Sequence, residues 1–404
     1  MSILRIGRRA GAALTTSGLL VALSTTALAE SGYSSPITLR TGPAGAAVHL
    51  WDIAVAGRDI AVIWEERLGD GRVVRLRTSR DGGRTFRAQR LVDGRGAYEG
   101  GTDVCAGYAW VANNFTLPDD PEGSWGLVVH GMPLNGTGRS REVIVGAGGS
   151  HNVGAVDLAC ARGRRRVVAW TDQDSQRSST IRLRFLPVLP GTEGVDEVDL
   201  SFRGSESSSV ALAAVRDRVW VTWVSPARRR IRVRAFDIGP APDYAVTPAL
   251  SLSLPEVGQN AFRSTLGAAG SRVIIAYSVE SGAYTRTSTD GGATFGPRRR
   301  LLRGRLADVS WSAHAADTRG RRAVVHAGMS GGMEGEFSTV MYRYRSFDGR
   351  SWSRVRRYTD GARMGAFSVT DGAARLVEAW DQSASSKPRK WLRFHREIRE
   401  HPLE

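Results

Sequence analysis

Acidic residues that directly follow aromatic residues are the residues of this sequence best suited to catalysis. Glu65 and Glu66 come directly after Trp64, and Asp52 comes directly after Trp51. Two carboxyl groups can hydrolyse a glycosidic bond with retention when they lie about 5.5 Å apart, and with inversion at about 6.5–9.5 Å. Asp52, Glu65 and Glu66 are therefore the candidate catalytic residues.

Further polar and aromatic residues occur at equivalent places along the chain, where they could meet a ligand. Carboxylates bind sugar hydroxyls, and aromatic rings stack on the apolar faces of sugars, so this combination suits a neutral glycan. The candidate ligand-binding residues are Trp51, Asp103, His151, Asn152, Asp172, Asn260, Arg263, Glu280, Trp311, Arg363 and Asp381. We find no metal-ligand spacing, phosphate loop or nucleophile motif, and therefore expect no metal and no cofactor.

These residues sit in a sequence that repeats about every 53 residues. Each unit has a small-residue strand, a polar turn and an apolar run with an aromatic end, as in residues 53–64. The run-ending residues are Trp64, Trp170, Trp223, Tyr277, His326 and Trp380. The first interval spans two periods, so residues 124–130 belong to a degenerate unit. The period predicts an all-β propeller of four-stranded antiparallel blades, seven in number, or six if residues 101–150 are an insertion. Residues 36–40 are placed to complete the last blade.

A second signature follows the apolar run in three units, and its spacing suits a tight hairpin turn. The aspartate can accept bonds from turn amides and hydroxyls, and a glycine can adopt positive φ, so its role is structural. Its residues are Ser79, Asp81, Gly83 and Phe86; Ser288, Asp290, Gly292 and Phe295; and, in a shorter copy, Ser346, Asp348 and Trp352.

This signature resembles the Asp-box, or BNR, repeat of sialidases and related β-propellers. The resemblance covers residues 36–395 and implies that a ligand binds on the face opposite the boxes. It does not extend to the sialidase active site, which has an early Phe-Arg-Ile-Pro element and three arginines that bind the substrate carboxylate. Residues 49–53 read His-Leu-Trp-Asp-Ile here, and only Arg263 and Arg363 suit a carboxylate.

The sequence also predicts where the protein works. Residues 1–29 have the basic start, apolar stretch and Ala-Leu-Ala end of a secretory signal peptide, which leaves residues 30–404 as a single propeller domain. Cys105 and Cys160 are the only cysteines, and in a secreted chain we expect them to form a disulfide. No later segment is apolar for long enough to span a membrane. We expect a monomer that is secreted or associated with the cell envelope.

The formal net charge of +16 raises the possibility of a polyanionic partner. Of the 56 cationic residues only Lys387 and Lys390 are lysines, a bias typical of a GC-rich genome, and we do not expect dedicated nucleic-acid binding. Arginines in the first turns should surround the Asp-box face, either as a solvated rim or as an anchor for anionic polymer or lipid headgroups.

Three functions remain open from the sequence. The first is a secreted, sialidase-like propeller that binds glycan or cell-envelope polymer without the sialidase reaction. The second is a diverged sialidase or other glycoside hydrolase. The third is an extracellular protein-interaction scaffold, which would expose a contiguous apolar patch.

Overall fold

The computed structural model describes most of residues 37–396 as strands and short turns. Residues 1–36 and 397–404 lie outside it, as do 42–46, 69–70, 96–99, 117–124, 138–139, 148–151, 162–164, 176–177, 187–197, 206–209, 225–229, 241–244, 256–260, 280, 304–306, 317–321, 332–337, 347–350, 352, 359–365, 371–375 and 384–389. From residue 303 onward, only the backbone is described, apart from Ser351. The predicted signal peptide is outside these residues.

The described strands form seven antiparallel sheets of four strands each. Sheet 1 is β2 (Ala47–Ala56), β3 (Asp59–Leu68), β4 (Gly71–Ser79) and β5 (Arg90–Asp93); sheet 2 is β6 (Gly100–Cys105), β7 (Tyr108–Thr116), β8 (Trp125–Pro133) and β9 (Arg141–Ala147). Sheet 3 is β10 (Asn152–Cys160), β11 (Arg166–Ser175), β12 (Ser178–Phe185) and β13 (Val198–Ser205); sheet 4 is β14 (Ala211–Val215), β15 (Arg218–Val224), β16 (Arg230–Ile238) and β17 (Val246–Pro255). Sheet 5 is β18 (Ala261–Ala269), β19 (Arg272–Val279), β20 (Gly282–Ser288) and β21 (Arg299–Arg303); sheet 6 is β22 (Ala307–Ala316), β23 (Arg322–Gly331), β24 (Ser338–Ser346) and β25 (Ser353–Tyr358). Sheet 7 is β26 (Ala366–Thr370), β27 (Leu376–Ser383), β28 (Lys390–Arg396) and β1 (Ile37–Thr41).

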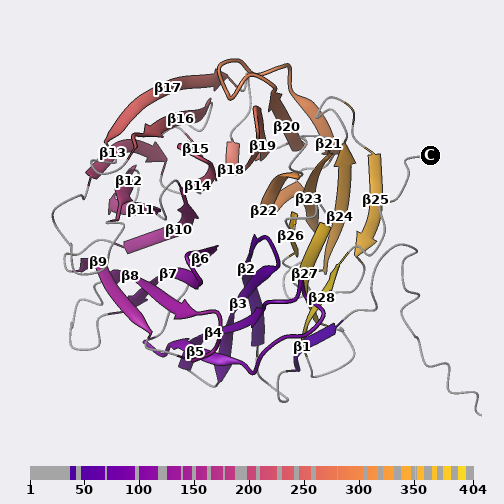
Figure 1. The fold of residues 1–404 in the computed structure, drawn as a ribbon. Coiled ribbons are helices and arrows are strands. Elements are labelled where there is room, and N and C mark those ends of the chain that lie inside the picture. Colours follow the sequence, from indigo (N-terminus) through magenta and orange to yellow (C-terminus); the bar gives the residue numbers. More distant parts are fainter. Residues whose placement is uncertain are drawn as a thin grey trace, which may run out of the picture.

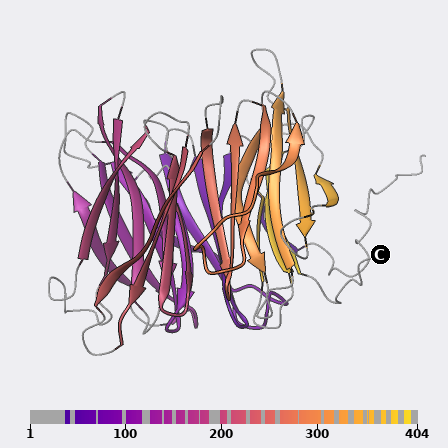
Figure 2. The ribbon, with the colours of Figure 1, turned by 90° about the horizontal axis from the view of Figure 1, so that it is seen from above.

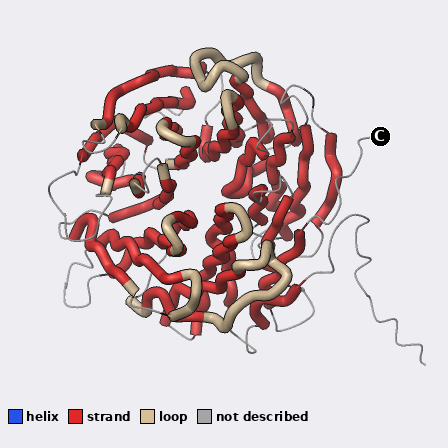
Figure 3. The backbone as a smooth tube through the Cα atoms, in the orientation of Figure 1, coloured by secondary structure: helices blue, strands red, loops and turns tan. Residues whose placement is uncertain are grey.

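The sheets surround a common axis. Figure 1 shows the first strand of each sheet nearest the centre and the fourth strand at the rim. In the view from above, the strands run roughly side by side through the thickness of the ring (Figure 2), and the described backbone contains strands and loops without a helix (Figure 3). Residues 100–147 form sheet 2, with the same strand order as its neighbours. No helix long and apolar enough to cross a membrane occurs in the part that is described.

The first and last described strands meet in sheet 7. Strand β1 pairs with β28 in antiparallel register, with Ile37 opposite Phe394, as the sequence predicted for this segment. Leu39 of β1 also packs with Leu50 and Ile60 of sheet 1. The Arg40 guanidinium donates to Glu66 of β3, with Nε 3.1 Å from Oε1. Sheet 7 therefore contacts sheet 1 through both apolar packing and an ion pair.

Strand position within a sheet explains the pattern of burial. Second strands such as β7 and β15 are buried along almost their whole length, because sheets pack on both of their faces. Third strands alternate, and β16 places Ile231 and Val233 inside with Arg230 and Arg232 outside. Apolar clusters join neighbouring sheets, so the core lies between sheets.

A disulfide between sheets 2 and 3 and the turns within sheets are two further structural features. Cys105 and Cys160 form the predicted disulfide between the ends of β6 and β10, with Cα atoms 6.2 Å apart. In the first Asp box, Asp81 accepts bonds from the hydroxyls of Ser79 (2.7 Å) and Thr85 (2.6 Å), and Gly83 has a φ of 78°. Gly82 N donates to Arg58 O at 2.9 Å, so the box lies beside the first hairpin of its sheet.

The second box repeats this arrangement. Asp290 accepts bonds from the hydroxyls of Ser288 and Thr294, both at 2.6 Å, and Gly291 N donates to Ser271 O at 2.7 Å. In the shorter copy, Asp348 and Trp352 lie outside the described residues, and only the backbone of Ser346 is described.

Basic residues at one position of the third strand link sheets 3, 4 and 5 each to the sheet before it. Arg184 donates to Val145 O at 2.6 Å, Arg234 lies 4.2 Å from the ring centroid of Phe202, and Arg286 donates to Pro255 O at 3.1 Å. The equivalent residue of sheet 2 is His130, which the register places opposite Val111. The sequence analysis missed this repeat, although a basic residue recurs there as Arg77, His130, Arg184, Arg234, Arg286, Arg345 and His395.

Candidate functional site

A cavity of about 230 Å³ lies at the ring axis, and we call it the axial cavity. Its wall consists of residues of the first strands β2, β6, β10, β14 and β18, together with Val210, which directly precedes β14. Glycines and small or apolar side chains make up most of the wall. The polar side chains among them are Asp52, Thr102, Asp103, Asp157, Ser264 and Thr265.

The three aspartates join successive first strands. Asp52 accepts the backbone N–H groups of Ile53 and of Thr102 in β6, both at 2.8 Å. Asp103 accepts the N–H of Cys160 in β10 at 2.6 Å, and Asp157 accepts the N–H of Leu212 in β14 at 2.6 Å. Each carboxylate thus satisfies an N–H group that the inner edge of the next sheet would otherwise leave unpaired.

Burial acts on all three carboxyl groups in the same direction. Desolvation, followed by repulsion from Asp157, raises the pKa of Asp52 well above its usual range, against the two backbone bonds that lower it. Desolvation raises the pKa of Asp103 to about 6 and that of Asp157 to about 7. The axial cavity therefore holds carboxyl groups that take up and release protons near neutral pH.

The candidate glutamates lie elsewhere. Glu65 is 1% exposed and pairs with Arg67 and Arg72, while Glu66 is fully buried and pairs with Arg40 and Arg75. Neither belongs to the wall of the axial cavity, so the structure does not bring them together with Asp52. Their observed contacts are ion pairs that hold strands together.

Trp51 closes part of the cavity wall. It is 7% exposed, and its ring packs so closely on Gly100 that a Cβ atom there would lie 2.9 Å from it. Its indole Nε1 has no hydrogen-bond partner among the described residues. The glycine thus allows first strands of sheets 1 and 2 to approach around the tryptophan.

The remaining candidates separate into two groups. Asp172 of β11 is buried and accepts a bond from Arg182 at 2.7 Å. His151, Asn260, Glu280 and Arg363 lie outside the described residues, and Asn152, Arg263, Trp311 and Asp381 are described by backbone alone. The structure thus brings Trp51, Asp52 and Asp103 together around one cavity.

Sequence reasoning missed Asp157. An acid within a run of small residues is the signal that could have identified it.

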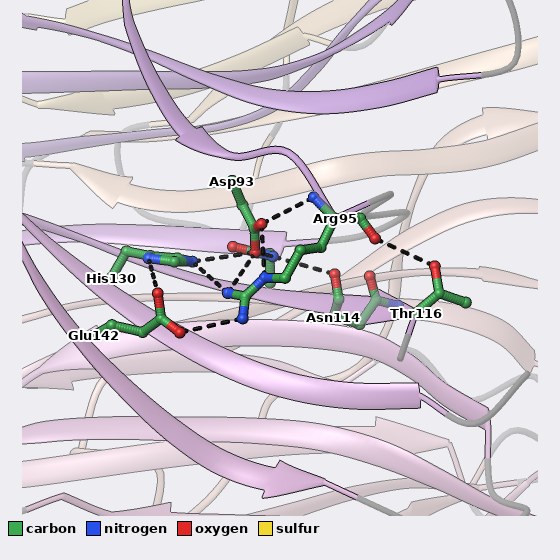
Figure 4. Close-up of polar contacts among 7 residues, drawn as sticks. Asp93, Arg95, Asn114, Thr116, His130 and Glu142 are labelled. Carbon is green, nitrogen blue, oxygen red and sulfur yellow. Dashed lines mark hydrogen bonds and ion pairs between the residues drawn. The ribbon is translucent and has the colours of Figure 1, made fainter. Parts of the chain in front are cut away.

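A second polar cluster lies between sheets 1 and 2 (Figure 4). Arg95 binds both oxygens of Asp93, at 2.9 and 3.0 Å, and its Nη1 lies 3.1 Å from Glu142 Oε1. His130 lies between the two acids, with Nε2 3.2 Å from Asp93 Oδ2 and Nδ1 3.6 Å from Glu142 Oε2. Asn113 donates a further bond to Asp93 at 3.0 Å.

In this cluster, His130 occupies the position of the arginine that links each of sheets 3, 4 and 5 to the sheet before it. Burial alone would raise the pKa of Asp93, but the bonds from His130, Arg95 and Asn113 hold it far below its usual range. The carboxylate of Asp93 is therefore charged, and both of its oxygens are bound by neighbouring side chains. No group of three or more potential metal ligands converges in the part of the chain that the structure describes.

Comparisons with known proteins agree with this architecture. No family model and no curated protein matches the chain. The structure of the phage phi92 endosialidase is similar, with a TM-score of 0.53 at 8% identity over 92% of this chain and 70% of that one. The Hadza microbial sialidase Hz136 gives 0.48 at 11% identity over 86% and 65%, and Trypanosoma rangeli sialidase gives 0.45 at 8% over 87% and 55%. The endosialidase similarity shows the fold alone: this chain is an all-β protein with the fold of sialidase-type β-propellers.

Proposed function

We propose that this chain is a secreted, monomeric propeller that binds a hydroxyl-rich glycan or cell-envelope polymer and does not catalyse the sialidase reaction. In this proposal residues 1–29 are removed, residues 30–404 form one domain, and the seven sheets are the blades of a complete ring. Trp51, Asp52, Asp103 and Asp157 contribute the described part of the ligand site.

The composition of the axial cavity wall carries this proposal. Its described residues present three carboxyl groups and no Lys, Arg or His. A sialic acid carboxylate would face like charges in a partly desolvated space, which is unfavourable. Sugar hydroxyls, by contrast, can donate to carboxylate oxygens, each of which accepts more than one bond.

A glycoside hydrolase is the second candidate, and the raised pKa values of Asp103 and Asp157 favour it. A general acid in glycoside hydrolysis must hold its proton near neutral pH, and burial is the usual means. The two backbone bonds that each carboxylate accepts argue for a structural role instead.

Exposed apolar surface gives the scaffold hypothesis no comparable support. The large hydrophobic residues that are exposed in the described part are Leu91 and Ile144.

Two measurements on the mature protein distinguish these functions. The first is a turnover screen with fluorogenic glycosides that include an α-sialoside, and the second is binding to a glycan array. We expect array binding without fluorophore release. Release that Asp157→Asn abolishes, and that the outer-surface control Asp237→Asn leaves unchanged, would establish the hydrolase instead. Silence in both measurements would contradict glycan binding.

A further inference from the structure

A row of three arginines in the outer half of sheet 4 has no acidic partner among the described residues (Figure 1). Arg230, Arg232 and Arg234 alternate along β16 with buried apolar residues, so they lie on one face of the sheet, and we call them the β16 arginine row. Arg230 donates to Ser253 Oγ at 3.2 Å, and Arg234 lies over the ring of Phe202. Arg232 is exposed, and its guanidinium has no hydrogen-bond, ion-pair or ring partner in the part of the chain that is described.

Equivalent arginines in two other sheets are neutralised by an acid. The register places Arg75, Arg182 and Arg232 opposite the tryptophan that ends the apolar run of the second strand in sheets 1, 3 and 4. In sheet 1 the residue two positions after that tryptophan is Glu66, which lies 3.3 Å from Arg75 Nε. In sheet 3 it is Asp172, which lies 2.7 Å from Arg182 Nε. In sheet 4 the sequence has a serine at this place, so the arginine of the repeat is kept without its acid.

The one acid in the four strands of sheet 4 lies on the other face. Asp237 is bound by Arg218, which the register places opposite it, and the alternation of side chains along β16 directs it away from the row. Burial, followed by repulsion from Arg232, lowers the pKa of Arg234. The strands of sheet 4 thus leave the charge of the row uncompensated, and an anion placed along it would relieve this repulsion.

We propose that the β16 arginine row binds a phosphodiester polymer of the cell envelope, of the polyol phosphate class. The polymer would run along β16 with its phosphates beside successive arginines, whose backbones are two residues or about 6.7 Å apart. This surface is separate from the axial cavity, so the inference goes beyond the proposed glycan binding and does not depend on it.

The geometry of the donors favours phosphate. A guanidinium group matches the oxygens of a phosphate in a two-pronged contact, and the tetrahedral phosphate projects oxygens in more than one direction, so that it can accept bonds from two neighbouring arginines. A carboxylate directs both of its oxygens to one side. Single-stranded nucleic acid would also need aromatic rings on which its bases can stack. The rings nearest the row do not offer this, because Trp223 and Phe202 stack on each other at 5.2 Å and Trp223 is 3% exposed.

The test measures binding of a fluorescently labelled glycerol phosphate oligomer to the mature protein by fluorescence anisotropy. An oligodeoxythymidylate and a galacturonate oligomer of equal charge are the comparison ligands. We expect the glycerol phosphate oligomer to bind at least fivefold more tightly than either. Three arginine contacts should give a slope of about −2 for the logarithm of the association constant against that of salt concentration, at about −0.7 for each contact, as in single-stranded polyanions.

Arg232→Gln tests the row directly. The substitution removes a guanidinium without a described partner, so the urea midpoint should not change, whereas affinity should fall at least fivefold and the salt slope should become shallower by about 0.7. Arg218→Gln is the matched control, because it removes the same charge from the opposite face of the same sheet. It should leave the affinity for the polymer unchanged.

Weaker binding by Arg232→Gln alone would support the inference. Equal losses in the two variants would overturn it, because they would indicate attraction to the overall net charge of +16. Absence of binding would overturn it too, and tighter binding of the oligodeoxythymidylate would indicate a nucleic-acid surface instead. Arg232→Gln should bind neutral glycans on the array as the parent protein does, so failure of this inference can be distinguished from failure of the proposed function.

Discussion

Replacing Asp93 by Asn removes the charge at the centre of the contact between sheets 1 and 2. The carboxylate is 3% exposed and receives bonds from Arg95, His130 and Asn113, while Arg95 is 31% exposed and keeps Glu142 as a partner. Breaking a buried ion pair by removing one partner costs about 3–5 kcal/mol. Arg95 remains partly accessible to solvent, and Asn can still accept one bond. We therefore expect the free energy of unfolding to fall by about 3 kcal/mol, the lower end of that range.

The chain supplies a matched control in Asp237, which pairs with Arg218 through the same two-pronged geometry, at 2.6 and 2.8 Å. That pair is exposed, with side chains 41% and 38% accessible, and exposed ion pairs contribute about 0–1 kcal/mol. Urea denaturation of both Asn variants at pH 7 measures the difference. Equal losses at the two sites would refute the argument that burial makes the Asp93 cluster a fastening between sheets.

The sign of the pH dependence follows from the lowered pKa of Asp93. A carboxyl group with a lowered folded pKa stabilises the protein above the unfolded value of about 3.9, and this contribution is lost as the pH falls through the folded pKa. The difference between wild type and Asp93→Asn should therefore be constant from pH 5 to 7 and shrink well below pH 4.

Three further perturbations test other parts of the structure. Reduction of Cys105–Cys160, which lie 55 residues apart, should lower the free energy of unfolding by about 4 kcal/mol in the chain-entropy model, measured by urea denaturation with and without reductant. Arg40→Ala should destabilise by about 2 kcal/mol, because among the described residues it leaves the buried Glu66 carboxylate with Arg75 as its ion-pair partner, and an unchanged urea midpoint would count against this contact. The raised pKa values of Asp103 and Asp157, about 6 and about 7, mean that the folded state binds extra protons between pH 4 and 7. Their contribution to stability should therefore decline as the pH rises across this range, and Asp157→Asn should make that slope shallower in a pH series of urea titrations.

The repeat and its turns could be predicted from sequence because they are local. Residues 53–64 show a strand, a turn and a strand in one uninterrupted stretch, and Asp81 finds its hydroxyl partners within four residues. Both the alternation of side chains along a strand and the conformational requirements of a tight turn can be recognised within such short segments.

The site could be predicted only in part, because it depends on contacts between sheets. Trp51, Asp52 and Asp103 were expected near a ligand, but the bond that Asp157 accepts from the Leu212 N–H joins residues 55 positions apart. Glu65 and Glu66 follow Trp64 just as Asp52 follows Trp51, so the sequence alone made them equally good candidates. Their burial depends on Arg40, Arg72 and Arg75, whose positions beside them follow from strand register and from the pairing of β1 with β28.

The shared last sheet imposes an order on biosynthesis. The ribosome makes strand β1 before every other described strand, yet its hydrogen-bonding partner β28 is made after all of them. At about 5–20 residues per second, β1 waits tens of seconds for that partner, with Ile37 and Leu39 lacking their final neighbours in the meantime. A chain that stops before residue 390 would leave β1 without its partner strand. The unpaired edge of the sheet could then pair with other molecules. Quality control that recognises such an edge would thus distinguish complete chains from truncated ones by a single missing strand.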